Sequence, residues 1–225
     1  MTEEKKLVIA IDGPAGAGKS TVASRIARKH GYLNIETGAM YRALALKAIS
    51  NDISVDEEDP LLRLAKDSHI QLLPQMDGNR VLLDGQNVSD RIREQDVTDA
   101  ASRVSVHPKV REWMVARQRE MGANGGVVME GRDIGTKVFP DADVKVFLDA
   151  DPAVRGARRF HQHQGGNLHD RAAVIAEMRE RDHRDRSRAS SPLQPASDAV
   201  IIDSTDLDLD QVIERVEAVI RGLIR

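Results

Sequence analysis

Gly13-Pro14-Ala15-Gly16-Ala17-Gly18-Lys19-Ser20 directly follows the apolar run 7–11 and Asp12. This GxxxxGKS pattern between a strand and a helix is typical of a phosphate-binding loop. Glycines let backbone N–H groups close around phosphate oxygens, the lysine adds a positive charge, and the serine hydroxyl can ligate Mg²⁺ at a helix N-terminus. Apolar side chains then recur at helical spacing as far as Ala27, and Gly31 suits a helix end. The stretch therefore predicts a binding site for a nucleoside triphosphate.

The composition narrows the class of protein. The 225 residues fit one large domain, or a core with inserted subdomains. The absence of cysteine excludes disulfides and thiolate metal sites, and the apolar stretch near Met1 is too short for a signal peptide or a membrane span. We expect a soluble cytoplasmic protein with no membrane partner.

Charge is nearly balanced over the chain but not locally. There are 33 basic and 36 acidic residues, which argues against a general nucleic-acid binder. Residues 155–188, however, hold nine arginines and no lysine against five acidic residues. Arginine without lysine favours forked contacts with phosphate or carboxylate groups.

The order of apolar segments predicts an α/β fold with a parallel sheet flanked by helices. A hairpin signal around Asp77-Gly78 interrupts it between residues 69 and 88, and the polar, glycine-containing segment 162–170 separates two arginine-rich helices. The remaining expected elements are strands 7–11, 32–35, 127–129, 144–148 and 199–202, and helices 20–29, 38–50, 60–67, 96–106, 108–121 and 209–223.

Polar residues follow the predicted strands at the point where each one ends. They are Asp12, Glu36-Thr37-Gly38, Glu130-Gly131-Arg132-Asp133, Asp149 and Asp151. In an open parallel sheet, ligands lie beyond the carboxyl ends of the strands. This set can hold Mg²⁺, phosphates and a second substrate.

Four motifs together resemble the bacterial cytidylate (CMP) kinase family, and the resemblance spans nearly the whole chain. They are IDGPAGAGKST at 11–21, ETGAMYRALAL at 36–46, EGRDIGTKVFPDADVKVFLDA at 130–150 and RERDHRDRSR at 179–188. The resemblance implies one P-loop kinase unit with a core (about 1–60, 96–154 and 186–225), a monophosphate-binding insert (about 61–95) and a lid (about 155–172). It also implies Mg²⁺-dependent transfer of a phosphoryl group from ATP to CMP or dCMP.

The resemblance implies that Ser102, Arg111 and Asp133 read the base. Cytosine offers an amino donor at N4 and acceptors at N3 and O2, so a hydroxyl or carboxylate and a guanidinium form a matching set. Uracil would leave buried partners unpaired. Ser102, next to two alanines, also suits a simple packing position.

The resemblance also indicates which residues bind the phosphate and the ribose of the acceptor nucleotide. Arg181, Asp185 and Arg188 are spaced so that they share one helix face. The resemblance implies that Asp185 bonds the ribose and the arginines the CMP phosphate, with Thr37 and Arg42 on the opposite side. The alternative is a solvated helix whose charges pair with one another.

Phosphoryl transfer requires charge neutralisation more than a strong base. We expect ATP along residues 13–20 and Thr21, with Lys19, Arg132, Arg158 and Arg159 at the transferring group. Arg155 is a weaker candidate for this role, and the alternative is that it is only a helix-surface charge.

The expected metal ligand is Ser20, with Asp12 and Glu36 acting through water. The family usually carries Asp where this chain has Glu36, so the added methylene leaves that role open, whereas Thr37 in place of the frequent Ser keeps the hydroxyl.

Three other functions compete with a CMP kinase. A related small kinase would act on another monophosphate or a metabolite. A GTPase-type switch is disfavoured because the chain has no NKxD motif, and a nucleic-acid-stimulated ATPase because aromatic residues are only 3% of the chain. We expect ATP, CMP and dCMP as partners, no nucleic acid, and a monomer.

Overall fold

The main sheet is parallel and has the phosphate loop at its centre. A computed structural model describes residues 6–75, 78–162 and 171–223. Its five-stranded sheet has the order β2-β6-β1-β7-β8, which confirms the predicted α/β fold. The strands are β1 (Val8–Asp12), β2 (Leu33–Glu36), β6 (Val127–Gly131), β7 (Val144–Asp149) and β8 (Val200–Asp203). The first and last residues of each strand lie within two positions of the predicted ones.

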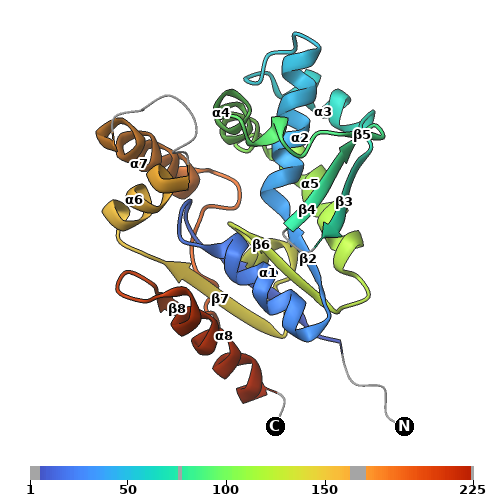
Figure 1. Cartoon of the computed structure of the whole chain (residues 1–225). Coiled ribbons are helices and arrows are strands. Elements are labelled where there is room, and N and C mark those ends of the chain that lie inside the picture. The colour runs from blue at the N-terminus through green and yellow to red at the C-terminus, as the bar shows by residue number, and fades with distance from the viewer. Residues whose placement is uncertain (1–5, 76–77, 163–170, 224–225) are drawn as a thin grey trace.

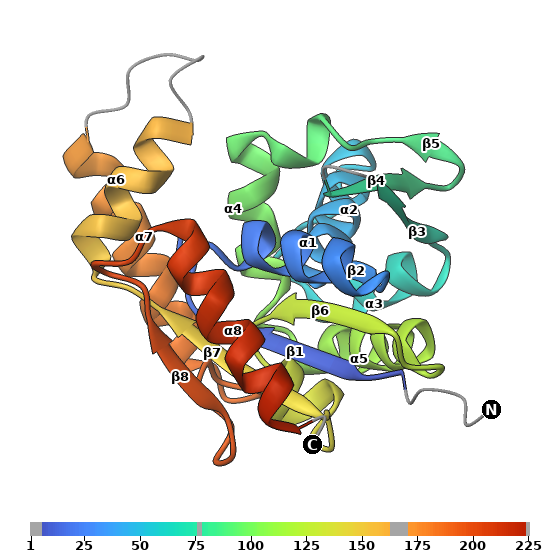
Figure 2. The ribbon, with the colours of Figure 1, turned by 60° about the horizontal axis from the view of Figure 1, so that its bottom comes forward.

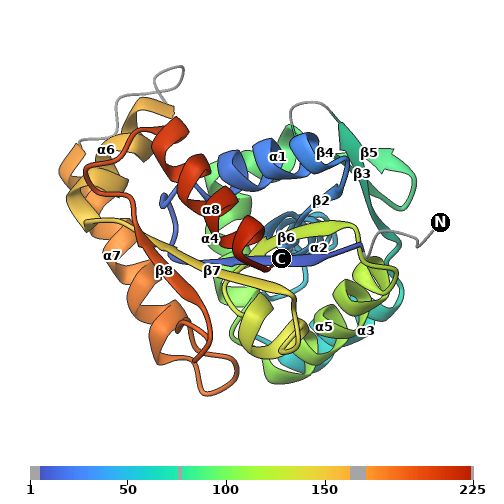
Figure 3. The same cartoon turned by 90° about the horizontal axis from the view of Figure 1, so that it is seen from below.

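Both faces of the sheet are covered by helices, as Figure 3 shows. Ile9 and Ile11 pack against α1 (Lys19–His30) and α8 (Leu209–Leu223), whereas Ala10 faces a cluster that includes α5 (Pro108–Gly122). A strand buried on both sides reads as a continuous apolar run, which is why residues 7–11 have no polar alternation. None of the described helices is both long and apolar enough to cross a membrane.

A second group of elements lies beside the sheet (Figure 1). It contains α2 (Thr37–Ser50), α3 (Glu58–Lys66), α4 (Gln95–Val104) and an antiparallel sheet of β3 (Ile70–Gln75), β4 (Gly78–Leu83) and β5 (Gln86–Asn87). The pairing of β3 with β4 confirms the hairpin, and Asp77 of its expected turn lies outside the described residues. One hydrophobic cluster joins α2, α3 and α4 to the first half of α5. The boundaries of the insert stay a prediction.

Two helices, α6 (Pro152–Gln162) and α7 (Arg171–Ser187), stand on the other side of the phosphate loop (Figure 2). Part of the expected lid (about 155–172), residues 163–170, lies outside the described residues. The sequence did not predict two short helical turns, η1 (Arg91–Arg93) and η2 (Ile134–Val138).

Candidate active site

A large cleft opens at the carboxyl ends of β1, β2 and β6. It has a volume of about 2510 Å³ and is lined by the phosphate loop, α1, α2, α4 and α7. Pockets for one small ligand typically measure about 300–1,000 Å³. The cleft therefore has room for two nucleotides.

The phosphate loop depends on glycine for its shape. Gly13 has a φ of +149°, and a Cβ atom there would lie 2.0 Å from the carbonyl oxygen of Leu148. The expected ATP residues from Ala15 to Thr21 line the cleft, whereas Gly13 and Pro14 connect β1 to this part of the loop and do not line it. The loop ends at the N-terminus of α1, whose first turn carries no acidic residue, so its partial positive charge is available to an anion.

Lys19 is folded back onto this loop. Its Nζ donates to the carbonyl oxygen of Pro14 at 2.7 Å, and the side chain is buried. Burial, followed by the nearby guanidinium of Arg132, lowers the pKa of Lys19 to about 7. Phosphate oxygens in the loop would favour the charged lysine and so oppose both effects.

The expected metal ligand, Ser20, has an acidic partner that the sequence analysis did not assign to the metal. Its Oγ donates to Oε1 of Glu130 at 2.5 Å, and Glu130 lies beside Glu36 in the register of β2 and β6. Burial and then the charge of Glu36 raise the pKa of Glu130. Two adjacent carboxylates and a hydroxyl are hard oxygen donors that suit Mg²⁺. The position of Glu130 at a strand end could have indicated a role in metal binding from the sequence.

Asp12 is engaged elsewhere. Its two carboxylate oxygens accept the backbone N–H groups of Ile134 and Gly135 at 2.8 and 2.7 Å. Burial raises the pKa of Asp12 to about 6. These contacts anchor η2 to β1 and do not favour the expected water-mediated contact with a metal, which stays a prediction.

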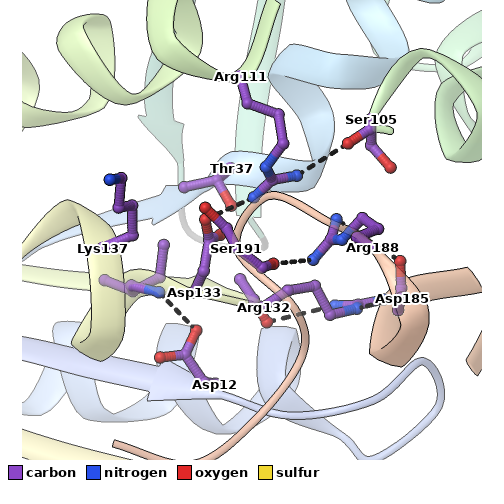
Figure 4. A network of polar contacts seen from close by, with 12 residues as sticks. Asp12, Thr37, Ser105, Arg111, Arg132, Asp133, Lys137, Asp185, Arg188 and Ser191 are labelled. Carbon is purple, nitrogen blue, oxygen red and sulfur yellow. Dashed lines mark hydrogen bonds and ion pairs between the residues drawn. The ribbon is translucent and has the colours of Figure 1, made fainter. Parts of the chain in front are cut away.

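The three expected base-reading residues, Ser102, Arg111 and Asp133, line the same cleft. Figure 4 shows Arg111 reaching toward Asp133 and Ser105. Arg111 forms a buried ion pair with Asp133 and also donates to the carbonyl oxygen of Ser105 at 3.0 Å. Ser102 is 5% exposed, and its hydroxyl has no hydrogen-bond partner within the described structure. An unsatisfied buried hydroxyl is costly unless a ligand engages it, so the packing interpretation of Ser102 is the weaker one.

The expected phosphate and sugar residues also line the cleft, although only Arg181 and Asp185 lie on α7, which ends one residue before Arg188. Nε of Arg132 donates to Oδ2 of Asp185 at 2.8 Å, and Arg188 lies 3.7 Å from the other oxygen of that carboxylate. Asp185 is 4% exposed, so the interpretation of this helix as freely solvated is wrong at this position. Burial and then the charge of Arg132 lower the pKa of Arg181 to about 10.

Thr37 and Arg42 lie across the cleft at the start of α2. Thr37 Oγ1 donates to the carbonyl oxygen of Glu130 at 2.8 Å, and Arg42 forms an ion pair with Glu36. Arg93, which the sequence analysis missed, lies 3.8 Å from the other oxygen of Glu36. Its location in a short turn of the insert carried no recognisable motif.

The arginines of α6 differ in their surroundings. Arg158 donates to the hydroxyl and carbonyl oxygens of Ser204 at 3.0 and 2.7 Å, and Arg159 lines the cleft beside Arg42. The interpretation of Arg155 as a helix-surface charge is wrong. It is 2% exposed and donates to Ala15, because its guanidinium fills the space between the phosphate loop and α7.

The cleft holds more buried cationic donors than the described chain satisfies. The Nε atoms of Arg42, Arg111, Arg181 and Arg188 are buried without a hydrogen-bond partner among the described residues. Buried donors of this kind are ordinarily paired. Their arrangement therefore points to anionic ligands.

A phosphate loop on a parallel sheet, opening into a cleft whose other end is rich in arginine, defines a P-loop kinase. The fold agrees with this class: a gluconokinase structure from Sinorhizobium meliloti superposes with a TM-score of 0.52 at 16% identity, covering 98% of this chain and 95% of that one. The family profile described as "Cytidylate kinase" matches residues 9–222. The chain belongs to the cytidylate kinase family.

Curated relatives support this membership. A cytidylate kinase of Anoxybacillus flavithermus is 47% identical over 97% of this chain and 97% of its own length. One from Geobacillus kaustophilus is 47% identical over 98% of this chain and 99% of its own length. The family predicted from the four motifs is therefore confirmed.

Proposed function

We propose that the cleft brings ATP and CMP or dCMP together with their phosphates facing each other. As a member of the cytidylate kinase family, the chain transfers the terminal phosphoryl group of ATP to CMP or dCMP and forms ADP with CDP or dCDP. The observation that carries our assignment of residues is the set of buried, unpaired donors on Ser102, Arg181 and Arg188.

The donor nucleotide is assigned to the phosphate loop. Backbone N–H groups of residues 15–21 and the charge of Lys19 would hold the β and γ phosphates. Ser20 and Glu130 would hold Mg²⁺, with Glu36 beside them, because this donor set combines a hydroxyl with two neighbouring carboxylates. When bound, Mg²⁺ neutralises charge on the transferring phosphates.

The acceptor nucleotide is assigned to the opposite end. Asp133 and the Ser102 hydroxyl can face the amino group of cytosine, while Arg111 can face its acceptors. Arg111 and Asp133 already hold each other in place, so the ligand meets a preorganised pair. Asp185 would bond the sugar, while Arg181, Arg188 and the residues at the start of α2 would hold the phosphate.

Arg132 links the two halves. It is paired with Asp185 on the acceptor side, and its charge adds to burial in lowering the pKa of Lys19 on the donor side. A cation between the triphosphate of ATP and the phosphate of the acceptor reduces their repulsion and stabilises the transferring group. Arg159 would add charge from α6. The attacking phosphate oxygen is already anionic, so this site requires no strong base.

The direct test is ADP release, measured with purified chain, Mg²⁺ and ATP against CMP, dCMP, UMP and AMP. CMP and dCMP should be turned over far more efficiently than UMP and AMP. Equal use of UMP would contradict the base-reading assignment, and activity that persists in excess chelator would contradict the metal assignment. We also expect a monomer, which sedimentation can check. The cytoplasmic location stays an expectation.

A further inference from the structure

Arg155 makes three contacts from an almost fully buried position. Its Nε donates to the carbonyl oxygen of Ala150 at 2.8 Å, and Nη1 donates to the carbonyl oxygen of Ala15 at 2.9 Å. Nη2 lies 2.6 Å from Oδ2 of Asp182 on α7. The planar guanidinium fork thus connects the end of β7, the phosphate loop and α7 at a single point.

The contact with Ala15 bears directly on phosphate binding. In a planar trans peptide, the carbonyl and the following N–H point in opposite directions. A donor that fixes the carbonyl of Ala15 therefore also fixes the direction of the N–H of Gly16. Gly16 lines the cleft, and its conformation is left-handed, with a φ of +74°. Arg155 thus orients one of the amides of the phosphate loop without pointing at the nucleotide itself.

The contact with Asp182 joins that loop to the acceptor side. Met178, Asp182 and Asp185 are spaced at i, i+4 and i+7 and so share one face of α7. A Cβ atom on Gly16 would lie 2.8 Å from Cε of Met178, so the loop and α7 are in direct contact. Asp185 on this face accepts the hydrogen bond of Arg132. The helix that holds the acceptor is therefore tied, through Arg155, to the loop that holds the donor.

We propose that Arg155 is a positioning residue that, with Asp182, couples the binding of the two nucleotides. Occupation of the phosphate loop fixes the Ala15–Gly16 peptide, Arg155 transmits that arrangement to Asp182, and α7 is held where Asp185 and Arg181 meet the acceptor. This inference rests on the proposed function, because it presumes ATP in the loop and CMP against α7.

The test measures coupling. The dissociation constant of CMP is determined with and without a non-hydrolysable ATP analogue for the intact chain, for Arg155→Lys and for Asp182→Asn. We expect the analogue to tighten CMP binding in the unaltered chain by about tenfold, within the range usual for coupled sites. The coupling ratio is the dissociation constant of CMP without the analogue divided by that with it. In both variants this ratio should fall at least threefold, because lysine lacks the planar fork of Arg155 and asparagine removes the negative charge that Arg155 contacts. Asp182→Asn carries the test if Arg155→Lys does not fold.

Two controls separate coupling from stability. Asp96→Asn disrupts another ion pair, in which Arg91 contacts both oxygens of Asp96 at 2.7 and 2.6 Å outside the cleft. Val216→Ala lowers stability from within the α8 core. Neither should change the ratio. Folded Arg155→Lys and Asp182→Asn with the full ratio, or an unaltered chain with a ratio of one, would overturn the inference. Failure of the unaltered chain to bind CMP would overturn the proposed function first.

Discussion

Ser102 provides the cleanest single-residue test of base recognition. Its hydroxyl has no partner to lose within the described structure, so Ser102→Ala should leave the melting temperature nearly unchanged. If the hydroxyl bonds cytosine, kcat/KM for CMP should fall about tenfold, the equivalent of about 1.4 kcal/mol, while ATP binding stays constant. Steady-state kinetics with CMP and UMP measures this change.

The neighbouring Ser105 offers a matched control for that substitution. Its hydroxyl donates to the carbonyl oxygen of Ser102 at 2.9 Å. Ser105→Ala should therefore lower stability by about 1 kcal/mol and leave the CMP to UMP ratio in place. An unchanged CMP preference in Ser102→Ala would show that the hydroxyl only fills space.

The lowered pKa of Lys19 predicts how stability depends on pH and how many protons ATP binding takes up. Its pKa of about 7 in the free chain lies below the usual lysine value of 10.5, so the unfolded chain holds more protons between these values. The free energy of unfolding should consequently rise as pH increases from about 7 to 10. Phosphates in the loop should restore the charged lysine, so ATP binding at pH 8 should take up close to one proton.

Calorimetry of ATP binding in buffers with different ionisation enthalpies measures that uptake. Lys19→Met removes the titrating group and should abolish most of it. Binding to the unaltered chain without proton uptake would mean that the lysine is already charged in the free loop.

At the scale of elements, the helices and strands of the sheet could be predicted because their apolar periodicity is strong. η2 could not, because it depends on Asp12 accepting two N–H groups from a segment more than a hundred residues away. The burial of Arg155 was missed for a similar reason. Its neighbours Arg158 and Arg159 make α6 look like a polar surface helix, and only the fold brings Ala15 and Asp182 to it.

The packing of the phosphate loop on α6 and α7 gives a prediction for Gly16→Ala. The left-handed backbone is unfavourable for alanine, and its Cβ would lie 3.1 Å from the carbonyl oxygen of Arg155. We expect KM for ATP to rise at least tenfold. Gly222→Ala is the control, because a Cβ atom there meets nothing within 4 Å, and it should leave kinetics unchanged. Normal ATP binding by Gly16→Ala would show that this contact can relax without cost.

At the scale of the whole molecule, the residues that line the candidate site were easier to predict from sequence than the packing and strand register that hold them in place. The expected base-reading and phosphate residues do line one cleft. They could be named in advance because the resemblance to a known family assigns them position by position. The hydrophobic cluster shared by α2, α3, α4 and α5 was not predictable, because residues from Ala39 to Met114 contribute to it across two expected units. Glu130 was seen at a strand end, but only the register of β2 and β6 places it beside Glu36.

The unpaired cationic groups of the same cleft should lower the stability of the nucleotide-free protein. The side chain of Arg181 is half-buried, but its Nε atom is buried and has no partner among the described residues. Desolvation, followed by the charge of Arg132, lowers the pKa of Arg181 to about 10. Arg181→Met should therefore raise the free energy of unfolding of the nucleotide-free chain by about 1–3 kcal/mol, because it removes a partly desolvated charge whose buried Nε donor is unpaired. CMP should then stabilise the variant much less than the unaltered chain, for which 100 Kd of ligand adds about 2.7 kcal/mol.

Urea unfolding with and without CMP measures both parts of this prediction. Arg155→Met is the control, since that arginine is more deeply buried than Arg181 but fully paired, and its removal should destabilise the free chain. If Arg181→Met instead lowers stability to the same extent, Arg181 is satisfied within the protein and does not await a ligand. A gain in stability together with a loss of CMP binding would show that the cationic cleft is maintained for its ligand at the expense of the fold.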